Sequence, residues 1–291
     1  MKKLRYLTEY IIFKALITFL RCLGINKSTN ICSYIARKIG PYLPYTKIAR
    51  NNLQKAYKDQ EIDIELTITD LWDNFGRYVG EFPFINTLSK EELNQRITMT
   101  GLENIRHLQQ QNKPFLLFLG HQGNWDFLIR RITDIYPKFG IIYRKANNPY
   151  VDKDVLGERQ NDPNITLIPK GTSGSKDLLK VIKKRHAIAM LIDQKMNDGI
   201  EVPFFNMKAM TAPAIARFSL KYDYPIVPAQ IIRKGKTSNF EVIIHSPLKY
   251  EATGSLEKDC YNVMLKINKM LEKWIRMHPS QWFWFHNRWK D

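Results

Sequence analysis

Six short apolar runs, bounded by Gly, Pro or Asn residues, recur along the chain. They are residues 115–120, 140–143, 165–168, 187–192, 226–232 and 240–245. Amphipathic stretches lie between them, among them residues 176–184 and 212–222. Strands that alternate with amphipathic helices are typical of an α/β fold, so we expect a largely parallel central sheet flanked by helices.

Helical spacing marks the regions on either side of these runs. Residues 29–86 predict mainly helix, interrupted at Gly40-Pro41 and at Pro44. Near the carboxyl end, apolar residues return at three- and four-residue spacing, which predicts a helix with one face packed on the body. They are Leu256, Cys260, Val263, Ile267, Met270, Leu271 and Trp274.

Residues 4–23 form the most apolar segment, yet Glu9, Lys14 and Arg21 interrupt it. A spanning helix needs about 20 mostly apolar residues with few charges, so a lysine near the middle disfavours a span. A helix lying in the membrane surface fits better, and a buried core helix is the alternative. We therefore divide the chain into a membrane-associated helix at residues 1–24 and a globular domain at residues 25–291.

The charge points to an anionic partner. The 291 residues contain 45 Lys and Arg against 28 Asp and Glu, a formal net charge of +17. Such self-repulsion is typical of proteins that work beside nucleic acid, anionic lipid or an acidic carrier. The three cysteines have no CxxC spacing, which disfavours a zinc cluster or a disulfide framework.

Chemically useful side chains follow four of the apolar runs. His121 follows the run 115–120, Arg144 follows 140–143, Lys170 follows 165–168 after one proline, and Asp193 follows 187–192. Ligands of parallel α/β sheets bind outside the carboxyl ends of the strands. We therefore expect an imidazole, two cations and a carboxylate to gather on one rim.

The most specific local pattern is the heptapeptide Gly120-His121-Gln122-Gly123-Asn124-Trp125-Asp126. Glycines allow a tight strand-to-helix turn around His121, and Asp126 then falls in the first helical turn. There its carboxylate is expected to hold one imidazole nitrogen and leave the other free to take a proton. A structural histidine is the alternative reading.

The glycine-rich stretch 171–175 supports no second chemistry. It lacks the last glycine of a nucleophile elbow and the lysine of a P-loop. Its backbone N–H groups are suited to an anion, and an ordinary turn is the alternative. The sequence contains no motif that requires a metal, and we expect no cofactor.

The residues resemble a known family, the bacterial lipid A biosynthesis acyltransferases, over almost the whole chain. The similarity lies in the basic and apolar amino-terminal helix and in an ordered set of blocks. These are His121–Asp126, Tyr143-Arg144, Asn148-Pro149, Arg159, Asp193-Gln194, Val202-Pro203-Phe204-Phe205, Thr211, Ala216-Arg217, Val227-Pro228, Arg233 and the aromatic-basic tail at residues 281–290. Gln122 departs from a residue that is often aromatic in the family, and Asn206 departs from a common glycine.

This resemblance implies a glycerolipid-acyltransferase-like α/β domain that transfers a fatty acyl chain from a thioester. The donor is usually acyl carrier protein, and the acceptor is a hydroxyl of a Kdo-bearing lipid A precursor. It also implies work at the cytoplasmic face of the inner membrane. Acyl carrier protein, the lipid A precursor and the inner membrane are thus the expected partners, and nucleic acid is not.

The resemblance and the pattern together assign provisional roles. We expect His121 to be the general base, oriented by Asp126, and Arg144 or Arg159 to stabilise the oxyanion. Lys170 and Arg233 are expected to bind phosphate or sugar carboxylates.

Other residues receive secondary roles. Asp193 is either an organiser of the basic residues or a helix cap. Trp125, Phe204 and Phe205 are expected to line an acyl pocket, with plain core packing as the alternative. The aromatic-basic tail, with Arg288 and Lys290, is expected either at the lipid headgroups or packed on the last helix.

Three rival functions stay open on sequence alone. The charge would suit a nucleic-acid-binding protein, but no basic stripe with interleaved aromatics supports it. A membrane protein without catalysis is the second. The third is an acyltransferase with a glycerophospholipid or phosphoinositol mannoside acceptor. The sequence does not distinguish a coenzyme A donor from acyl carrier protein, nor does it set acyl length, the acylated hydroxyl or the oligomeric state.

Overall fold

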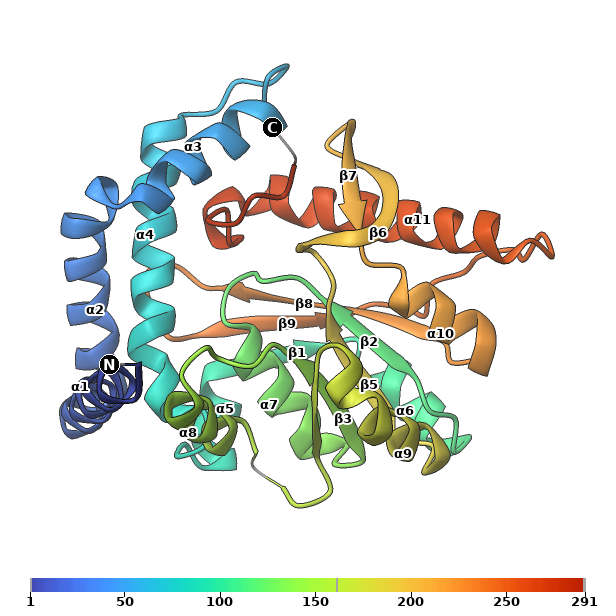
Figure 1. The fold of residues 1–291 in the computed structure, drawn as a ribbon, viewed down its shortest axis with the longest axis horizontal. Coiled ribbons are helices and arrows are strands. Elements are labelled where there is room, and N and C mark those ends of the chain that lie inside the picture. Colours follow the sequence, from blue (N-terminus) through green and yellow to red (C-terminus); the bar gives the residue numbers. More distant parts are fainter. Residues whose placement is uncertain (1, 161, 290–291) are drawn as a thin grey trace.

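A seven-stranded sheet lies at the centre of the computed structural model, which describes residues 2–160 and 162–289 (Figure 1). The strand order is β1-β9-β8-β2-β5-β3-β4. Its strands are β1 (Ile97–Thr100), β2 (Leu116–Leu119), β3 (Phe139–Tyr143), β4 (Thr166–Pro169), β5 (Ala187–Leu191), β8 (Ile226–Arg233) and β9 (Phe240–Ile244). Only the β8–β9 pair is antiparallel, so the predicted largely parallel sheet is confirmed.

Helices surround the sheet and extend to one side of it (Figure 1). They are α1 (Lys2–Leu23), α2 (Ile25–Ile39), α3 (Pro44–Ala56), α4 (Ile64–Glu81), α5 (Lys90–Arg96), α6 (Leu102–Gln110), α7 (Trp125–Ile135), α8 (Pro149–Arg159), α9 (Ser175–Lys183), α10 (Ala214–Tyr222) and α11 (Leu256–Met277). Short 3-10 turns are η1 (Gly40–Tyr42), η2 (Phe82–Phe84), η3 (Thr172–Gly174) and η4 (Pro279–Gln281). The predicted helical region and the predicted last helix are both confirmed.

Two apolar clusters fill the two faces of the sheet, because successive side chains of a strand point to opposite faces. On β2, Phe118 lies in the cluster under α10 and α11, whereas Leu117 lies in the cluster under α6 and α7. All four residues of β2 are fully buried. A continuous apolar run is what a central parallel strand requires, and this is why the run was visible in the sequence.

Two parts of the sheet structure were not predicted. Strand β1 is short and alternates apolar with polar residues, so it resembles no buried run. The antiparallel hairpin of β6 (Lys195–Phe204) and β7 (Met207–Thr211) forms a separate two-stranded sheet. Its strands carry several exposed or charged residues, which hid them.

The aromatic-basic tail packs into the protein. Trp282 and Trp284 are fully buried, and Trp289 and the guanidinium of Arg288 are buried beside them. The alternative that placed this tail at the lipid headgroups is therefore wrong, and the packing alternative is confirmed. Lys290 lies outside the described residues.

Helix α1 contributes little to the core. Only Ile17 and Leu20 of this helix are buried. Among the described residues, 13 of the 19 exposed large apolar side chains fall between Leu4 and Tyr45. The alternative of a buried core helix is therefore wrong, while membrane contact stays a prediction. No helix in the described part of the chain has the length and apolar character needed to cross a membrane.

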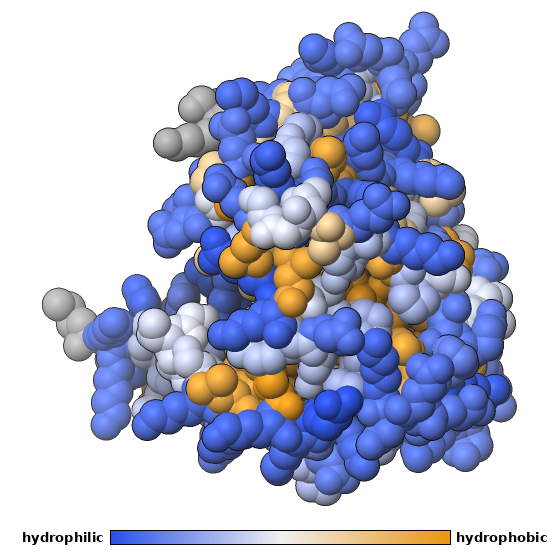
Figure 2. Space-filling view, turned by 90° about the vertical axis from the view of Figure 1, so that its right-hand side faces the viewer, coloured by the Kyte–Doolittle hydropathy of each residue, from blue (hydrophilic) through white to orange (hydrophobic). Residues whose placement is uncertain are grey.

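The opposite side of the molecule has a different surface. This side carries α10 and the end of α11 and is mainly hydrophilic, with hydrophobic residues gathered near its middle (Figure 2). The exposed apolar surface is therefore concentrated at α1, α2 and the turn that follows them.

Candidate active site

A cavity of about 510 Å³ opens at the carboxyl ends of β2, β3, β4 and β5. Its size is typical of small-molecule and cofactor sites, and its position is the one expected for a parallel sheet. Polar and charged side chains line one part of it: His121, Asp126, Arg130, Arg144, Arg159, Lys170 and Gln194. The remainder is largely apolar, so the cavity can hold both a reacting polar group and an aliphatic chain.

His121 and Asp193 lie side by side just beyond the ends of two neighbouring parallel strands, β2 and β5. Leu119 of β2 pairs with Leu191 of β5, and each of the two site residues comes two positions later. The imidazole Nδ1 lies 2.7 Å from Asp193 Oδ1, and the backbone N–H of His121 donates to Oδ2 at 2.7 Å. The other ring nitrogen, Nε2, makes no hydrogen bond within residues 2–160 and 162–289.

Asp193 is fully buried and ionised. Burial alone would raise its pKa, but the charge and hydrogen bond of His121 hold the pKa of this carboxyl well below its usual range. Trp282 donates its indole N–H to Asp193 Oδ2 at 2.6 Å. A carboxylate fixed on one imidazole nitrogen sets the tautomer and orients the other nitrogen for proton transfer.

Asp126 has different partners from those expected. It lies in the first turn of α7 as predicted, but Arg159 donates to it from Nε at 2.8 Å and from Nη2 at 3.1 Å. The Tyr78 hydroxyl also donates to it, at 2.7 Å. The predicted pairing of Asp126 with His121 is thus corrected, because the register of β2 and β5 brings Asp193 to the ring instead.

Asp126, Arg159 and Tyr78 form a cluster in which each residue affects the pKa of another. Burial alone would lower the pKa of Arg159, but the carboxylate of Asp126 and the Tyr78 hydroxyl raise it above its ordinary value. Burial, and then the charge of Asp126, raise the pKa of Tyr78 well above its ordinary value. The guanidinium therefore stays charged beside the cavity and Tyr78 stays a donor.

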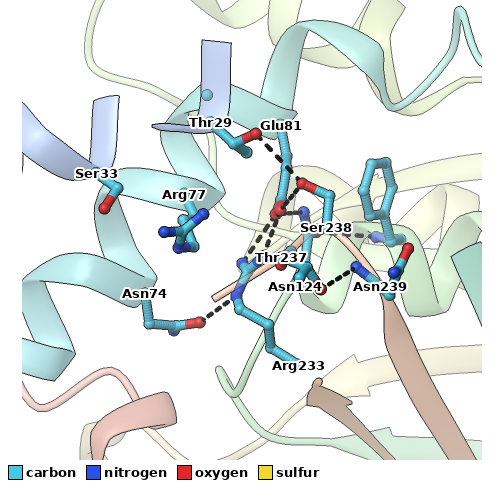
Figure 3. A network of polar contacts seen from close by, with 12 residues as sticks. Thr29, Ser33, Asn74, Arg77, Glu81, Asn124, Arg233, Thr237, Ser238 and Asn239 are labelled. Atoms are coloured by element: carbon cyan, nitrogen blue, oxygen red, sulfur yellow. Dashed lines mark hydrogen bonds and ion pairs between the residues drawn. The ribbon is translucent and has the colours of Figure 1, made fainter. Parts of the chain in front are cut away.

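A buried polar network fixes the start of α7 (Figure 3). Glu81 is fully buried and accepts from Arg233, from Ser238 at 2.8 Å and from the side-chain amide of Asn124 at 2.8 Å. Asn124 in turn caps α7, because its side chain accepts from the backbone N–H of Phe127 at 3.0 Å. The network thereby places the residues between His121 and Asp126.

Arg233 belongs to this network and not to the cavity. Its guanidinium is buried and also bonds Asn74 Oδ1 and the carbonyl of Thr237, both at 2.8 Å. The expected contact of Arg233 with substrate phosphate is therefore corrected. The residue does end a strand at the predicted rim, but α4 covers that part of the rim with Glu81.

The aromatic-basic tail also holds the loop that carries His121. Phe283 N donates to the carbonyl of His121 at 2.9 Å, and Gly123 N donates to the carbonyl of Gln281 at 3.0 Å. Gly123 has a φ of 56°, and an added Cβ would come within 2.8 Å of the carbonyl oxygen of Ile231. Glycine is required there by backbone conformation and by space.

Arg144 and Lys170 are neighbouring cations. Tyr143 and Pro169 are paired in β3 and β4, so the next residue of each strand lies at the same edge. Both side chains line the cavity, and neither makes an ion pair within the described ranges. Two cations that have no acidic partner in the described part of the chain, at one mouth of the cavity, suit an anionic group of a substrate.

The apolar wall is formed by residues that the sequence did not single out. It includes Ile142, Ile168, Leu178, Met190, Met196 and Phe218, from β3, β4, α9, β5, β6 and α10. Trp125 lines the cavity as expected. Phe204 and Phe205 do not, because they pack among Tyr57, Trp282, Trp284 and Trp289, so their acyl-pocket role is corrected to core packing.

Tyr78, Trp282 and Glu81 were missed as residues that support the site. The first two donate to the two site carboxylates, and the third anchors Asn124. One signal could have paired His121 with Asp193, because each of these residues directly follows an apolar run. No local signal marks Tyr78 or Glu81, since both lie on a helix remote in sequence.

The structure brings a histidine and a buried carboxylate together at a half-apolar cavity on the rim of an α/β sheet. This arrangement is suited to acid–base chemistry on a partly aliphatic substrate. The sequence profile of the family described as "Bacterial lipid A biosynthesis acyltransferase" matches residues 1–291. The chain therefore belongs to the bacterial lipid A biosynthesis acyltransferases.

Curated relatives agree with this assignment. The chain is 27% identical over 196 residues to the lipid A biosynthesis lauroyltransferase of Escherichia coli K12, covering 65% of this chain and 60% of that protein. It is 21% identical over 269 residues to the lipid A biosynthesis palmitoleoyltransferase of the same organism, covering 89% and 85%. A lipid A biosynthesis acyltransferase of Shigella flexneri has the same identity and coverage.

Proposed function

We propose that this protein transfers a fatty acyl chain from the thioester of acyl carrier protein to a hydroxyl of a Kdo-bearing lipid A precursor. Family membership supports acyl transfer in lipid A biosynthesis. The observation that supports the mechanism is the hydrogen bonding of His121. Its Nδ1 is held by buried Asp193, while its Nε2 at the cavity has no hydrogen-bond partner among the described residues.

In the proposed reaction His121 acts as general base. Nε2 takes the proton of the acceptor hydroxyl as its oxygen attacks the thioester carbonyl. The ionised Asp193 stabilises the imidazolium that forms. When the tetrahedral intermediate collapses, the carbon–sulfur bond breaks and the imidazolium returns the proton to the leaving thiolate. No covalent acyl-enzyme is needed.

Arg159 and Arg144 are the candidate donors to the oxyanion of that intermediate. Both line the cavity, and Arg159 is held in place by Asp126, which also accepts a hydrogen bond from Tyr78. A fixed cation aimed at developing negative charge is a large source of catalysis. Asp126 thereby contributes through Arg159, as a positioning residue.

Lys170, together with Arg144, is proposed to bind an anionic group of the acceptor or of the acyl donor, next to the atoms that react. Phosphate and sugar carboxylates of the acceptor fit this role, and so does the phosphate that links the acyl arm to its carrier. The apolar wall that includes Leu178 and Met190 is proposed to receive the acyl chain.

Helix α1 is proposed to lie on the cytoplasmic face of the inner membrane, with residues 25–291 as the acyltransferase domain. Its exposed apolar side chains include Leu4, Ile11, Ile12 and Phe19, each more than half exposed. Basic residues flank them, which favours an anionic lipid surface.

Acyl transfer in detergent tests this function. Wild type and His121→Ala are given acyl carrier protein thioesters of several lengths and the Kdo-bearing precursor. Product from wild type, with at least about a hundredfold less from the variant, is expected. Product with glycerophospholipid or with coenzyme A thioesters instead would replace this acceptor or this donor. Equal product from wild type and variant would overturn the role of His121.

A further inference from the structure

Helix α8 carries Arg159 on its last turn but has no fully buried residue. Its apolar residues Val151, Val155 and Leu156 are only half-buried. Apolar burial normally fixes a helix on its domain. Polar contacts therefore carry much of the task of holding α8, and with it Arg159, against the cavity.

Several of these polar contacts come from α1. Lys14 Nζ lies 2.8 Å from Asp154 Oδ2, and Arg21 Nη2 lies 2.5 Å from Glu158 Oε1. The acids are four residues apart on α8 and the bases are seven apart on α1, so each pair of residues shares one helix face. The two helices thus meet along a charged seam.

The amino-terminal end of α8 is tied to the same helix. Asn148 caps α8 by accepting from the backbone N–H of Tyr150 at 3.1 Å. Its amide group donates to the carbonyl of Tyr6 at 2.8 Å and to Glu9 Oε2 at 3.0 Å. Helix α1 therefore holds α8 at its start, its middle and its end.

Glu158 and Arg159 are adjacent, so one turn is held from two sides. Arg21 holds Glu158 on the side of α1, and Asp126 holds Arg159 on the side of the cavity. A shift of α8 along α1 would move the guanidinium relative to the cavity. Misplacement of a reacting or stabilising group by about 1 Å is enough to lower a rate about a hundredfold.

From this arrangement we propose that Lys14 and Arg21 of α1, through Asp154 and Glu158 of α8, are positioning residues for Arg159. The inference rests on the proposed function, because the rate that these residues affect is the rate of acyl transfer. It gives α1 a second task, since the helix with the exposed apolar face also sets one wall of the active site.

A charge exchange tests the proposal with the full-length protein. The variants are Lys14→Glu, Asp154→Lys and the double variant Lys14→Glu/Asp154→Lys. Lys258→Glu is the control with the same change of charge, because Lys258 is exposed on α11 and lies outside both α1 and α8. Each single variant is expected to lower kcat about tenfold, and the double variant to recover to within about threefold of wild type. Lys258→Glu is expected to match wild type.

Amide hydrogen exchange in residues 149–159 gives a readout that does not depend on activity. Exchange is expected to quicken in both single variants and to return toward wild type in the double variant. Partly exposed pairs add little to global stability, so the unfolding midpoint is expected to change little.

Any other pattern overturns the proposal, including unchanged single variants, a double variant that fails to recover, or an equal effect of Lys258→Glu. If the wild type transfers no acyl chain to any acceptor, the proposed function fails. The exchange data then decide alone whether α1 positions α8.

Discussion

Asp193 Oδ1 and His121 Nδ1 lie 2.7 Å apart because two parallel strands are paired so that the residues after them stand side by side. The pair is therefore built into the register of the sheet, and α7 is not needed to bring a carboxylate to the ring. This leaves Asp126 free to hold Arg159.

Replacing Asp193 by Asn tests the central pair. The amide has nearly the shape of the carboxylate but no charge to stabilise an imidazolium, and it favours the wrong tautomer of His121. We expect kcat to fall about 10³- to 10⁴-fold, with the KM for the acyl donor changed less than about threefold. Steady-state kinetics on the folded variant measure this. A parallel rise in KM would contradict a role confined to proton transfer.

Asp126→Asn should act through Arg159. We expect about a hundredfold loss of kcat. We expect Arg159→Lys to lower kcat by a similar factor. The double variant should lose little more kcat than either single variant, because all three lose the same placed guanidinium. Fully multiplicative losses would show that Asp126 acts independently of Arg159.

Tyr78→Phe is the milder test of the same cluster. It removes one donor to Asp126 and keeps the ring that stacks on Trp125, with centroids 4.2 Å apart. We expect kcat to fall about threefold to tenfold while the unfolding free energy drops by about 1 kcal/mol. Activity equal to wild type would show that Arg159 alone fixes Asp126.

Glu81→Gln should lower stability. It breaks a buried ion pair and leaves Arg233 charged without its partner, so we expect the free energy of unfolding to fall by about 3–5 kcal/mol. The matched control is Glu65→Gln, whose ion pair with Arg50 is largely exposed and is expected to contribute less than about 1 kcal/mol. Urea unfolding measures both. Similar small losses would show that the network is not a structural anchor.

Acyl-chain preference should depend on the apolar wall. Leu178→Trp fills the cavity from α9, and Leu179→Trp places the same ring at a neighbouring position that is 51% exposed. We expect the first variant to favour shorter acyl chains by about tenfold in relative kcat/KM and the second to keep the wild-type preference. Competition between thioesters of two lengths measures this. A changed preference in Leu179→Trp and not in Leu178→Trp would show that the acyl chain does not bind at this apolar wall.

Acid should destabilise the fold partly through His286. Burial lowers the pKa of this imidazole to about 4, against an ordinary value of 6.5. Between these values the unfolded chain binds more protons, so the free energy of unfolding falls as the pH drops from 6.5 to about 4 and then levels off. Because the ring keeps some contact with water, we expect about 2 kcal/mol from this residue.

The comparison of wild type with His286→Gln isolates this effect from those of His245 and His278, whose pKa values burial also lowers. Urea unfolding at pH 4.5 and 7 should show a smaller pH effect in the variant. His107→Gln, at an exposed position on α6, is the control and should behave as wild type. An equal pH effect in wild type and His286→Gln would show that His286 does not contribute to the loss of stability in acid.

The sequence predicted well what depends on local pattern. The apolar runs became strands of the central sheet, and those of β2, β5 and β8 are buried on both faces. His121 was found because glycines bracket it after such a run. Its carboxylate partner depends on which strands are neighbours, because Asp193 reaches the ring only when β2 and β5 are paired in the sheet. Arg233 shows the converse limit. It ends β8 at the same rim, but α4, remote in sequence, covers that part of the rim, so its expected contact with substrate was wrong.

Trp282 of the tail completes the support of Asp193, and Phe283 binds the backbone of His121. The acid–base pair is thus assembled from three segments, and the third follows His121 only after the whole sheet and α11. A chain still being synthesised can pair β2 with β5 and yet lack the indole that holds the carboxylate. Catalytic competence should therefore appear only once the tail has left the ribosome, so that the growing chain stays inactive on lipid.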